Sequence, residues 1–348
     1  MALKFVRTFA LIAAAALAAC SAGSGQGAPA GGQVVNLYSA RHYDSDAIIY
    51  DAFTKDTGIR VRRIEAPADQ LIARMKAEGD ASPADVLLIP DAGSMGLAAD
   101  AGLLQPSPLP TLEAKVPAYL RDPQGRWYAV ARRARVVAYD TAKVKPEEVA
   151  TYEQLASPRF RGKLCVRSSD NPYNLSLMSA LIERWGEAKA LAWAKGIVAN
   201  MARQPSGGDI DQIRAVGAGQ CEIAITNSYY YLRIAGSTAA EDKALVSRVV
   251  LAWPSLEGRG AHENVSGAGI AAHAPNKANA LRFLNYLLEA KAQATFADAT
   301  NEFPVVAGTA MPARVAKYSA MPADPLPVSS YGQYQARAQK LFEAAGWR

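Results

Sequence analysis

Short apolar runs alternate along the chain with segments whose apolar residues recur at helical spacing. The segment 68–78, for example, places Leu71, Ile72 and Met75 on one face of a helix. Such alternation with short turns is typical of a mostly parallel sheet with helices on both faces. The expected strands are 34–38, 59–64, 85–89, 127–139, 163–167, 222–226 and 264–272. The expected helices are 45–57, 68–78, a short one ending at Gly102, 174–185, 187–201, 209–216, 228–235, 277–290 and 332–345.

The predicted strand at 127–139 is long enough to pass from one packed unit to another. About 315 residues follow the N-terminal segment, a length that favours two cores over one. We therefore predict two α/β lobes joined by crossover strands near 131–136 and 262–268, with a cleft between them as the default ligand site. The predicted N-lobe comprises 34–132 and 265–308, and the predicted C-lobe comprises 133–264 and 309–348.

The N-terminal segment differs from the rest of the chain. Two basic residues precede an apolar run at 8–19, which is shorter than the roughly 20 residues of a membrane-spanning helix. The run ends in LAAC, which resembles the lipobox of bacterial lipoproteins. We expect residues 1–19 to be a signal peptide, Cys20 to be acylated, and 20–33 to be a flexible tether in the periplasm. The alternative is an ordinary signal peptide followed by a chance cysteine.

The charge distribution and the cysteine content further restrict the classes of function and of binding site that the sequence supports. The formal net charge of +6 is spread without a Lys/Arg run, so nucleic-acid binding has little support. Besides Cys20, the chain has Cys165 and Cys221, each in an apolar run predicted as a strand. An exported protein can join such a pair in a disulfide, but two buried free thiols are the slightly favoured prediction. Neither CxxC nor a Cys/His zinc spacing occurs.

Tyrosines gather at three predicted strand-to-helix junctions. SARHYD carries His42 and Tyr43, SSDNPY carries Tyr173, and NSYYYLR carries Tyr229 to Tyr231. In open α/β sheets, ligands bind beyond the carboxyl ends of the strands, where helix N-termini favour anions. These junctions therefore suit phenolates, provided that a strong positive charge lowers the tyrosine pKa from its ordinary value near 10.

A trivalent metal would supply that charge. Fe(III) is small and hard, so it prefers phenolate oxygen to thiolate, and one neutral imidazole can complete its shell. Three positive charges and four phenolates leave a net charge of about −1, which Arg133, Arg135 or Arg203 would offset. Binding would displace protons from the ligands, so the affinity should fall in acid.

A family resemblance covers the chain from about residue 34 to the C-terminus. The chain resembles the periplasmic iron(III)-binding proteins of ABC importers, the bacterial transferrins, in the subgroup with a His–Tyr pair. This resemblance implies a type II periplasmic binding protein, with two lobes that are each a mostly parallel sheet flanked by helices. The segments that carry it are YSARHYDSD (38–46), SPADVLLIPD (82–91), RWYAVARRARVVAYD (126–140), RSSDNPYNLSL (167–177), ARQPSGGDIDQI (202–213), ITNSYYYLR (225–233) and EGRGAHENVSGAG (257–269).

The resemblance also assigns a metal site. It implies that the ligands are His42, Tyr43, Tyr173, Tyr229 and Tyr230. Tyr231 lies outside the usual adjacent pair and is left out. Arg203 and, as a weaker candidate, Arg133 would balance the ligand charge from outside the shell. With this full set, a bound anion such as carbonate is less needed, and a shell that contains a histidine leaves both Fe3+ and Fe2+ open.

The function implied by the resemblance is capture of ferric iron outside the cytoplasm and delivery to an ABC permease in the inner membrane, by a monomer that is not an enzyme. A receptor for another small solute, such as an anion, a polyamine or a thiamine-like compound, is the alternative on the same fold. An exported enzyme has little support, because no GxSxG, SxxK, HExxH or Walker motif occurs. His262 is expected to be structural, and His273 is assigned no role.

Overall fold

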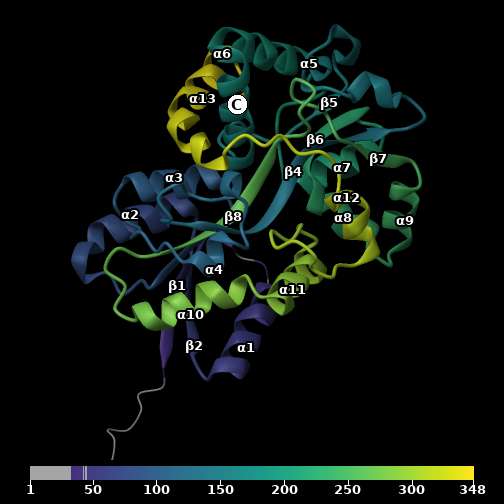
Figure 1. Cartoon of the computed structure of the whole chain (residues 1–348). Helices are drawn as coiled ribbons and strands as arrows, with labels where there is room; N and C mark the ends of the chain where they lie inside the picture. Colours follow the sequence, from purple (N-terminus) through teal and green to yellow (C-terminus); the bar gives the residue numbers. More distant parts are fainter. Residues whose placement is uncertain (1–32, 42, 44) are drawn as a thin grey trace, which may run out of the picture. The chain divides into compact units, whose positions relative to one another are not determined.

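The computed structural model describes residues 33–41, 43 and 45–348 (Figure 1). The predicted signal peptide, Cys20 and His42 therefore lie outside the described residues. In the part of the chain that is described, no helix combines the length and apolar character needed to cross a bilayer.

Strands and helices alternate through the first half of the described chain and then follow a less regular order. The strands are β1 (Val34–Ser39), β2 (Arg60–Glu65), β3 (Val86–Ile89), β4 (Tyr128–Asp140), β5 (Leu164–Cys165), β6 (Ile223–Asn227), β7 (Val249–Ala252) and β8 (Glu263–Ile270). The helices are α1 (Asp46–Thr57), α2 (Ala68–Glu78), α3 (Ala92–Asp100), α4 (Pro110–Glu113), α5 (Tyr152–Leu155), α6 (Pro172–Asn200), α7 (Asp209–Gly217), α8 (Ser228–Ala235), α9 (Ala240–Val246), α10 (Lys277–Leu287), α11 (Ala290–Thr300), α12 (Ala313–Ser319) and α13 (Tyr331–Ala345).

The strands pair in the order β2-β1-β3-β8-β4-β6-β5, and β7 pairs with β4. The pairings β1–β2, β1–β3 and β5–β6 are parallel, as the alternating pattern predicts. The pairings that involve β4 or β8 are antiparallel, so the sheet is mixed rather than mostly parallel. Apolar runs reveal that a strand is buried but not its direction, which explains the difference.

Strand β4 belongs to both halves of this sheet. It pairs with β8 up to Ala134, opposite Glu263, and with β6 from Arg135, opposite Asn227. We call the β2-β1-β3-β8 side with the first part of β4 the N-half, and the last part of β4 with β5, β6 and β7 the C-half. The long predicted strand is thus confirmed as one continuous element. The residue boundaries given for the two lobes stay predictions.

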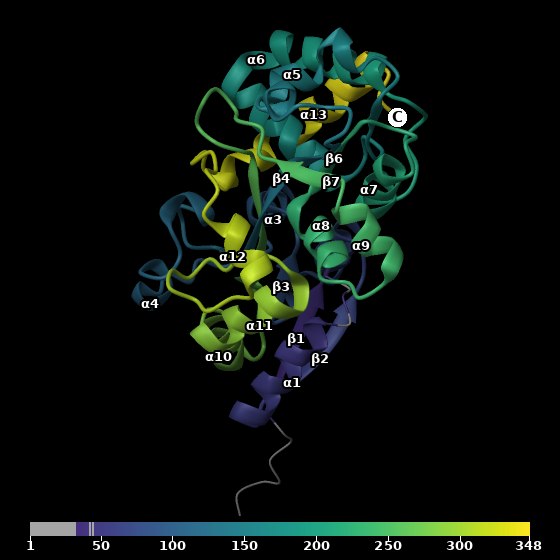
Figure 2. The same ribbon diagram turned by 90° about the vertical axis from the view of Figure 1, so that its right-hand side faces the viewer.

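Helices cover both sides of the N-half. Helices α1, α10 and α11 pack together, whereas α2 and α3 pack against the other side (Figures 1 and 2). Helix α13 packs on both α6 and α3, so the C-terminal helix contacts elements that belong to each half. This packing buries a core that includes Trp127, Tyr128 and Phe342.

Several predicted elements are divided differently in the structure. The predicted helices 174–185 and 187–201 form α6, with a break at Gly186, whose φ of 76° is left-handed. The predicted helix 277–290 is shorter in the structure, where α10 ends at Leu287. A short turn separates it from α11, which begins at Ala290. Helices α9 and α12 and strand β7 were not predicted. These elements are short, and tertiary packing rather than local pattern supports them.

The structure joins Cys165 and Cys221 in a disulfide, which corrects the prediction of two free thiols. Cys165 ends β5, and Cys221 lies just before β6, the parallel neighbour of β5, so their Cα atoms lie 5.9 Å apart. The two residues are 56 positions apart in sequence. Only the pairing of the two strands brings them together.

A buried ionic network lies in the N-half, close to the point where β4 passes to the C-half. Glu302 accepts hydrogen bonds from Arg41 at 2.7 Å and from Arg133 at 3.3 Å. Arg41 also donates to both carboxylate oxygens of Asp46, at 2.8 and 3.0 Å. Ser266 of β8 accepts from both guanidinium groups. Burial alone would raise the pKa of Glu302, but the charges of Arg41 and Arg133 outweigh it and lower that pKa. The carboxylate is therefore ionised and bridges two cations.

The disulfide generates a prediction about stability. Reduction should lower the free energy of unfolding by about 2–4 kcal/mol, because the open loop regains entropy in the unfolded chain. Urea unfolding of residues 33–348 with and without reductant measures this. The double variant Cys165→Ala/Cys221→Ala should not respond to reductant. An unchanged wild-type curve under reductant would contradict the pairing.

The ionic network generates a second prediction. Glu302→Gln should lower the free energy of unfolding by about 3–5 kcal/mol, because two buried guanidinium groups lose their shared anion. Glu65→Gln is the matched control, since it removes a carboxylate from the half-exposed pair with Arg63, and it should cost less than about 1 kcal/mol. Equal losses in urea unfolding would mean that Glu302 does not act as a buried bridge.

Candidate metal centre

Local structure places each candidate tyrosine at the start of a helix or just before one. Tyr43 follows β1 and precedes α1, and Tyr173 is the second residue of α6. The side chain of Asn171 accepts a hydrogen bond from the Tyr173 amide at 3.0 Å and so caps α6. Strand β6 runs directly into α8, whose first turn carries Tyr229 and Tyr230.

The hydroxyl groups of three of these tyrosines form a chain. The Tyr43 and Tyr229 oxygens lie 3.0 Å apart, and Tyr229 donates to Tyr173 at 3.4 Å. The rings of Tyr229 and Tyr230 lie side by side, with centroids 4.1 Å apart. Tyr43 belongs to the N-half and the other three belong to the C-half. The four predicted tyrosines are therefore brought together from both sides of the crossover.

Burial raises the pKa of Tyr43, Tyr173 and Tyr229. Tyr229 is 2% exposed, and burial, with the neighbouring phenols, raises its pKa well above the ordinary value. Burial raises the pKa of Tyr173 to about 12, with Tyr230 adding to the increase and Arg133 opposing it. Burial also raises the pKa of Tyr43, as do the charges that Tyr173 and Tyr230 would carry. Without a cation among them, these groups hold their protons at physiological pH.

Guanidinium groups surround the cluster. Arg41 and Arg233 lie over the ring of Tyr43, with centroid distances of 5.4 and 5.2 Å. Arg133 and Arg167 lie over the ring of Tyr173, at 5.6 and 5.7 Å. Arg233 also lies 5.8 Å from the ring of Tyr230. These separations are within the range of cation–π attraction, so the rings of the cluster lie against several guanidinium groups.

Sequence reasoning missed three of these four arginines. Arg133 was a weaker candidate for charge balance, and its side chain does lie against Tyr173. Arg167 had a detectable signal, because it follows a strand just before a candidate ligand. Arg233 also had one, because it lies three and four residues after the adjacent tyrosines and so shares their helix face. Arg41 is separated from Tyr43 by one residue, and that spacing alone predicts no contact.

The remaining predicted residues have different surroundings. Arg203 donates to Gln212 at 2.9 Å and to Ser206, so the recorded hydrogen bonds of its side chain hold its own loop. Its role in charge balance stays a prediction, as does the role of His42 as a metal ligand. Tyr231, which was left out of the ligand set, donates to the backbone oxygen of Val249 at 2.9 Å, away from the cluster.

The two histidines that were not assigned to the site lie elsewhere. His262 is buried just before β8 beside the ring of Tyr331. Burial lowers its pKa to about 3, with Arg135 and Arg133 adding to the decrease, so its ring is neutral. His273 is half-exposed and lies 3.0 Å from Asp80.

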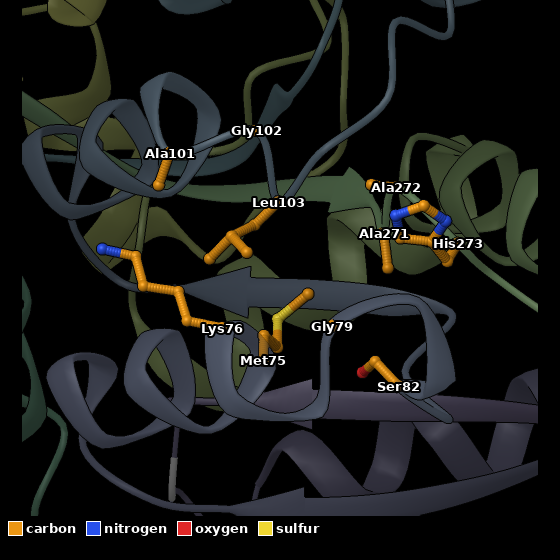
Figure 3. A pocket seen from close by; sticks show the side chains of 10 residues that line it. All are labelled: Met75, Lys76, Gly79, Ser82, Ala101, Gly102, Leu103, Ala271, Ala272 and His273. Atoms are coloured by element: carbon orange, nitrogen blue, oxygen red, sulfur yellow. The ribbon is translucent and has the colours of Figure 1, made fainter.

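A separate surface hollow of about 200 Å³ lies beside α2. Figure 3 shows Lys76 and His273 on opposite sides of it, and tyrosines are absent from its lining residues. Among residues 33–41, 43 and 45–348, no group of three or more His, Cys, Asp or Glu side chains lies close enough together to hold a metal ion. The described part of the chain therefore offers its phenol cluster as the candidate centre for a hard cation.

Relatives of known function share this chain's length and fold. The chain is 44% identical over 316 residues to iron uptake protein A1 of Synechocystis sp., covering 91% of this chain and 88% of the relative. A Trichodesmium protein (IdiA, FutA), solved in complex with iron and citrate ligands, is 46% identical with a TM-score of 0.85, and the match covers 90% of this chain and all of that one. The ferric binding protein of Campylobacter jejuni is 34% identical with a TM-score of 0.86 and the same coverage.

The resemblance drawn from the sequence motifs is thereby confirmed, as is the two-lobed periplasmic binding protein fold. A family model described as "Bacterial extracellular solute-binding protein" matches residues 49–323, which is most of the chain. The chain belongs to the bacterial extracellular solute-binding protein family.

Proposed function

We propose that the chain captures ferric iron between its two halves, with Tyr43, Tyr173, Tyr229 and Tyr230 as phenolate ligands and His42 as the fifth. The observation that carries this proposal is the chain of hydroxyl groups, in which Tyr43 of the N-half lies 3.0 Å from Tyr229 of the C-half. Oxygens that already lie within hydrogen-bond distance need only small shifts to face one ion.

The chemistry of the cluster selects a highly charged cation. Each phenol must lose a proton to become a strong ligand, and burial opposes that loss. Fe3+ offers the charge and hardness that compensate for it, whereas an anion or polyamine receptor has no use for several adjacent phenols. Fe2+ would compensate for less of the free energy needed to deprotonate the phenols, because it carries one charge fewer. Ferric iron is therefore the proposed cargo.

The relatives support the same assignment. Their names connect them with iron uptake and ferric-ion binding, and they match this chain over most of its length. The ligand set of this chain includes an imidazole and four phenols, so carbonate or citrate is proposed as an optional addition to the shell rather than a requirement.

Delivery to the importer follows from the two-lobed fold. Iron would first meet the C-half, which carries three of the four tyrosines, and closure would then bring in Tyr43 and His42. Docking on an ABC permease in the inner membrane would favour reopening. Acylation at Cys20 and the tether at 20–33 would keep the monomeric protein beside the membrane in the periplasm.

Iron binding should colour the protein, because phenolate-to-Fe(III) charge transfer absorbs visible light. Tyr229→Phe should weaken both the band and the affinity by at least about tenfold, since it removes the central oxygen of the hydroxyl chain. Tyr231→Phe is the matched control and should bind and absorb like the wild type. Absorbance titration with a ferric chelate measures both. Equal bands in the two variants would overturn the ligand assignment, and a colourless wild type would favour another solute.

Affinity for iron should fall as the pH falls. The pKa values of Tyr43, Tyr173 and Tyr229 are raised, so these three ligands are protonated at neutral pH and binding must release their protons. If four protons leave, the apparent affinity drops by roughly ten-thousandfold per pH unit. Tyr43→Phe should reduce that slope by about one proton. Competition against a chelator at several pH values tests this, and a pH-independent affinity would contradict phenolate binding.

A further inference from the structure

A short connecting segment leads from β5 directly to one of the candidate ligands. Residues 166–171, which we call the β5–α6 loop, join β5 to α6, whose second residue is Tyr173. The Tyr173 hydroxyl group stands at one end of the hydroxyl chain, where it accepts from Tyr229 at 3.4 Å. The position of that oxygen depends on where α6 begins, and the β5–α6 loop sets where α6 begins.

Residues that follow α13 contact this loop through hydrogen bonds. The indole N–H of Trp347 donates to the backbone oxygen of Arg167 at 3.1 Å. The amide of Ser169 donates to the backbone oxygen of Arg348 at 3.4 Å. Trp347 and Arg167 are 180 positions apart in sequence, so these two contacts fix the loop to a distant part of the chain.

The side chain of Trp347 is itself held in one place. It is 2% exposed, and its ring centroid lies 4.7 Å from that of Phe342 and 6.1 Å from that of Trp193. Gly346, with a left-handed φ of 78°, ends α13, and the Trp347 amide then donates to the backbone oxygen of Phe342 at 3.0 Å. The packing and the turn together give the indole N–H a fixed direction towards the loop.

The other contacts of the loop backbone are local. Asn174 donates to the backbone oxygens of Arg167 and Ser168 at 3.1 and 2.9 Å, and Asn171 caps α6 by accepting from the Tyr173 amide. These bonds join residues at most seven positions apart, so they shape the loop and the helix start as one unit. The contacts from Trp347 and Arg348 attach that unit to α13.

We propose that Trp347 is a positioning residue, which holds the β5–α6 loop in place and thereby keeps Tyr173 in line with the other candidate ligands. The proposal rests on the proposed function, because Tyr173 is one of the proposed ligands. It gives a role in iron retention to a residue outside the tyrosine cluster. Without the indole hydrogen bond, the loop would move more freely, and iron would leave the site sooner.

Trp347→Phe tests the hydrogen bond while it keeps an aromatic ring in the stack. In the iron-free protein, hydrogen exchange of the Ser169 amide should become about 2–10-fold faster, the factor that corresponds to one neutral hydrogen bond. In the Fe3+ complex, release of iron to a competing chelator should accelerate by a similar factor. Exchange measured by mass spectrometry and stopped-flow absorbance provide the two readouts.

Trp193→Phe is the matched control. Trp193 is buried in the same aromatic stack, and its indole N–H donates to a backbone oxygen at 2.7 Å, but that oxygen belongs to Tyr152 at the start of α5. Both variants remove one indole hydrogen bond and part of one ring, so both should lower the urea midpoint to a similar extent. Only Trp347→Phe should change the exchange of Ser169 and the release of iron.

A double-mutant cycle shows whether Trp347 acts through Tyr173. Tyr173→Phe removes the proposed ligand oxygen, so the position of that ring should no longer affect the bound ion. Adding Trp347→Phe to Tyr173→Phe should therefore leave the release rate of the single Tyr173→Phe variant unchanged. A purely structural role of Trp347 would give the same acceleration in both backgrounds.

The outcomes separate this inference from the proposed function. If wild-type protein takes up no coloured iron, the proposed function fails and the role in iron retention fails with it, while exchange in the iron-free protein still decides whether Trp347 holds the loop. If the wild type is coloured but Trp347→Phe keeps the wild-type exchange or release rate, the inference alone is overturned. Equal acceleration of release by Trp193→Phe would overturn it as well, because the effect would then come from the stack in general.

Discussion

Phenols packed side by side in a buried place cannot all ionise unless a cation lies among them. This constraint governs the cluster of Tyr43, Tyr173, Tyr229 and Tyr230. The hydroxyl groups of Tyr43, Tyr173 and Tyr229 are close enough to hydrogen-bond while they are neutral, and burial raises the pKa of each. The same closeness becomes strong repulsion once the protons leave. In the proposed function, the positive charge of the cation favours ionisation of the phenols and offsets the repulsion between the phenolates. Capture would therefore be selective for cations of high charge.

The surrounding charges fit this requirement. Glu302 bridges Arg41 and Arg133 in the buried network of the N-half, and each of these arginines lies over a ring of the cluster. The network fixes cations near the tyrosines without leaving a large uncompensated charge in the core, because Asp46 and Glu302 balance the two guanidinium groups. It also connects β4, through Arg133, and β8, through Ser266, to the surroundings of the cluster.

The fold and the candidate site determine different properties of the protein. Members of a solute-binding family share two lobes and a crossover, and that architecture alone does not select a ligand. In the proposed function, selectivity would come from phenols at the ends of strands and starts of helices, where side chains from separate segments converge. The disulfide between Cys165 and Cys221 links β5 to the start of β6, the two strands that lead towards Tyr173 and Tyr229. It therefore supports the half that carries three of the four tyrosines.

Local pattern was sufficient to locate most long elements, such as α2 and β4, because their apolar spacing is strong and their turns are short. It was also sufficient to place five tyrosines at strand-to-helix junctions, but the family resemblance was needed to select Tyr43, Tyr173, Tyr229 and Tyr230 and to leave out Tyr231. It could not reveal strand direction, the pairing of Cys165 with Cys221, or the convergence of Arg41 and Arg233 on Tyr43, because those contacts join residues from distant segments or depend on side-chain direction. Tertiary structure decided them, since only packing of the two halves sets which charges and sulfurs meet.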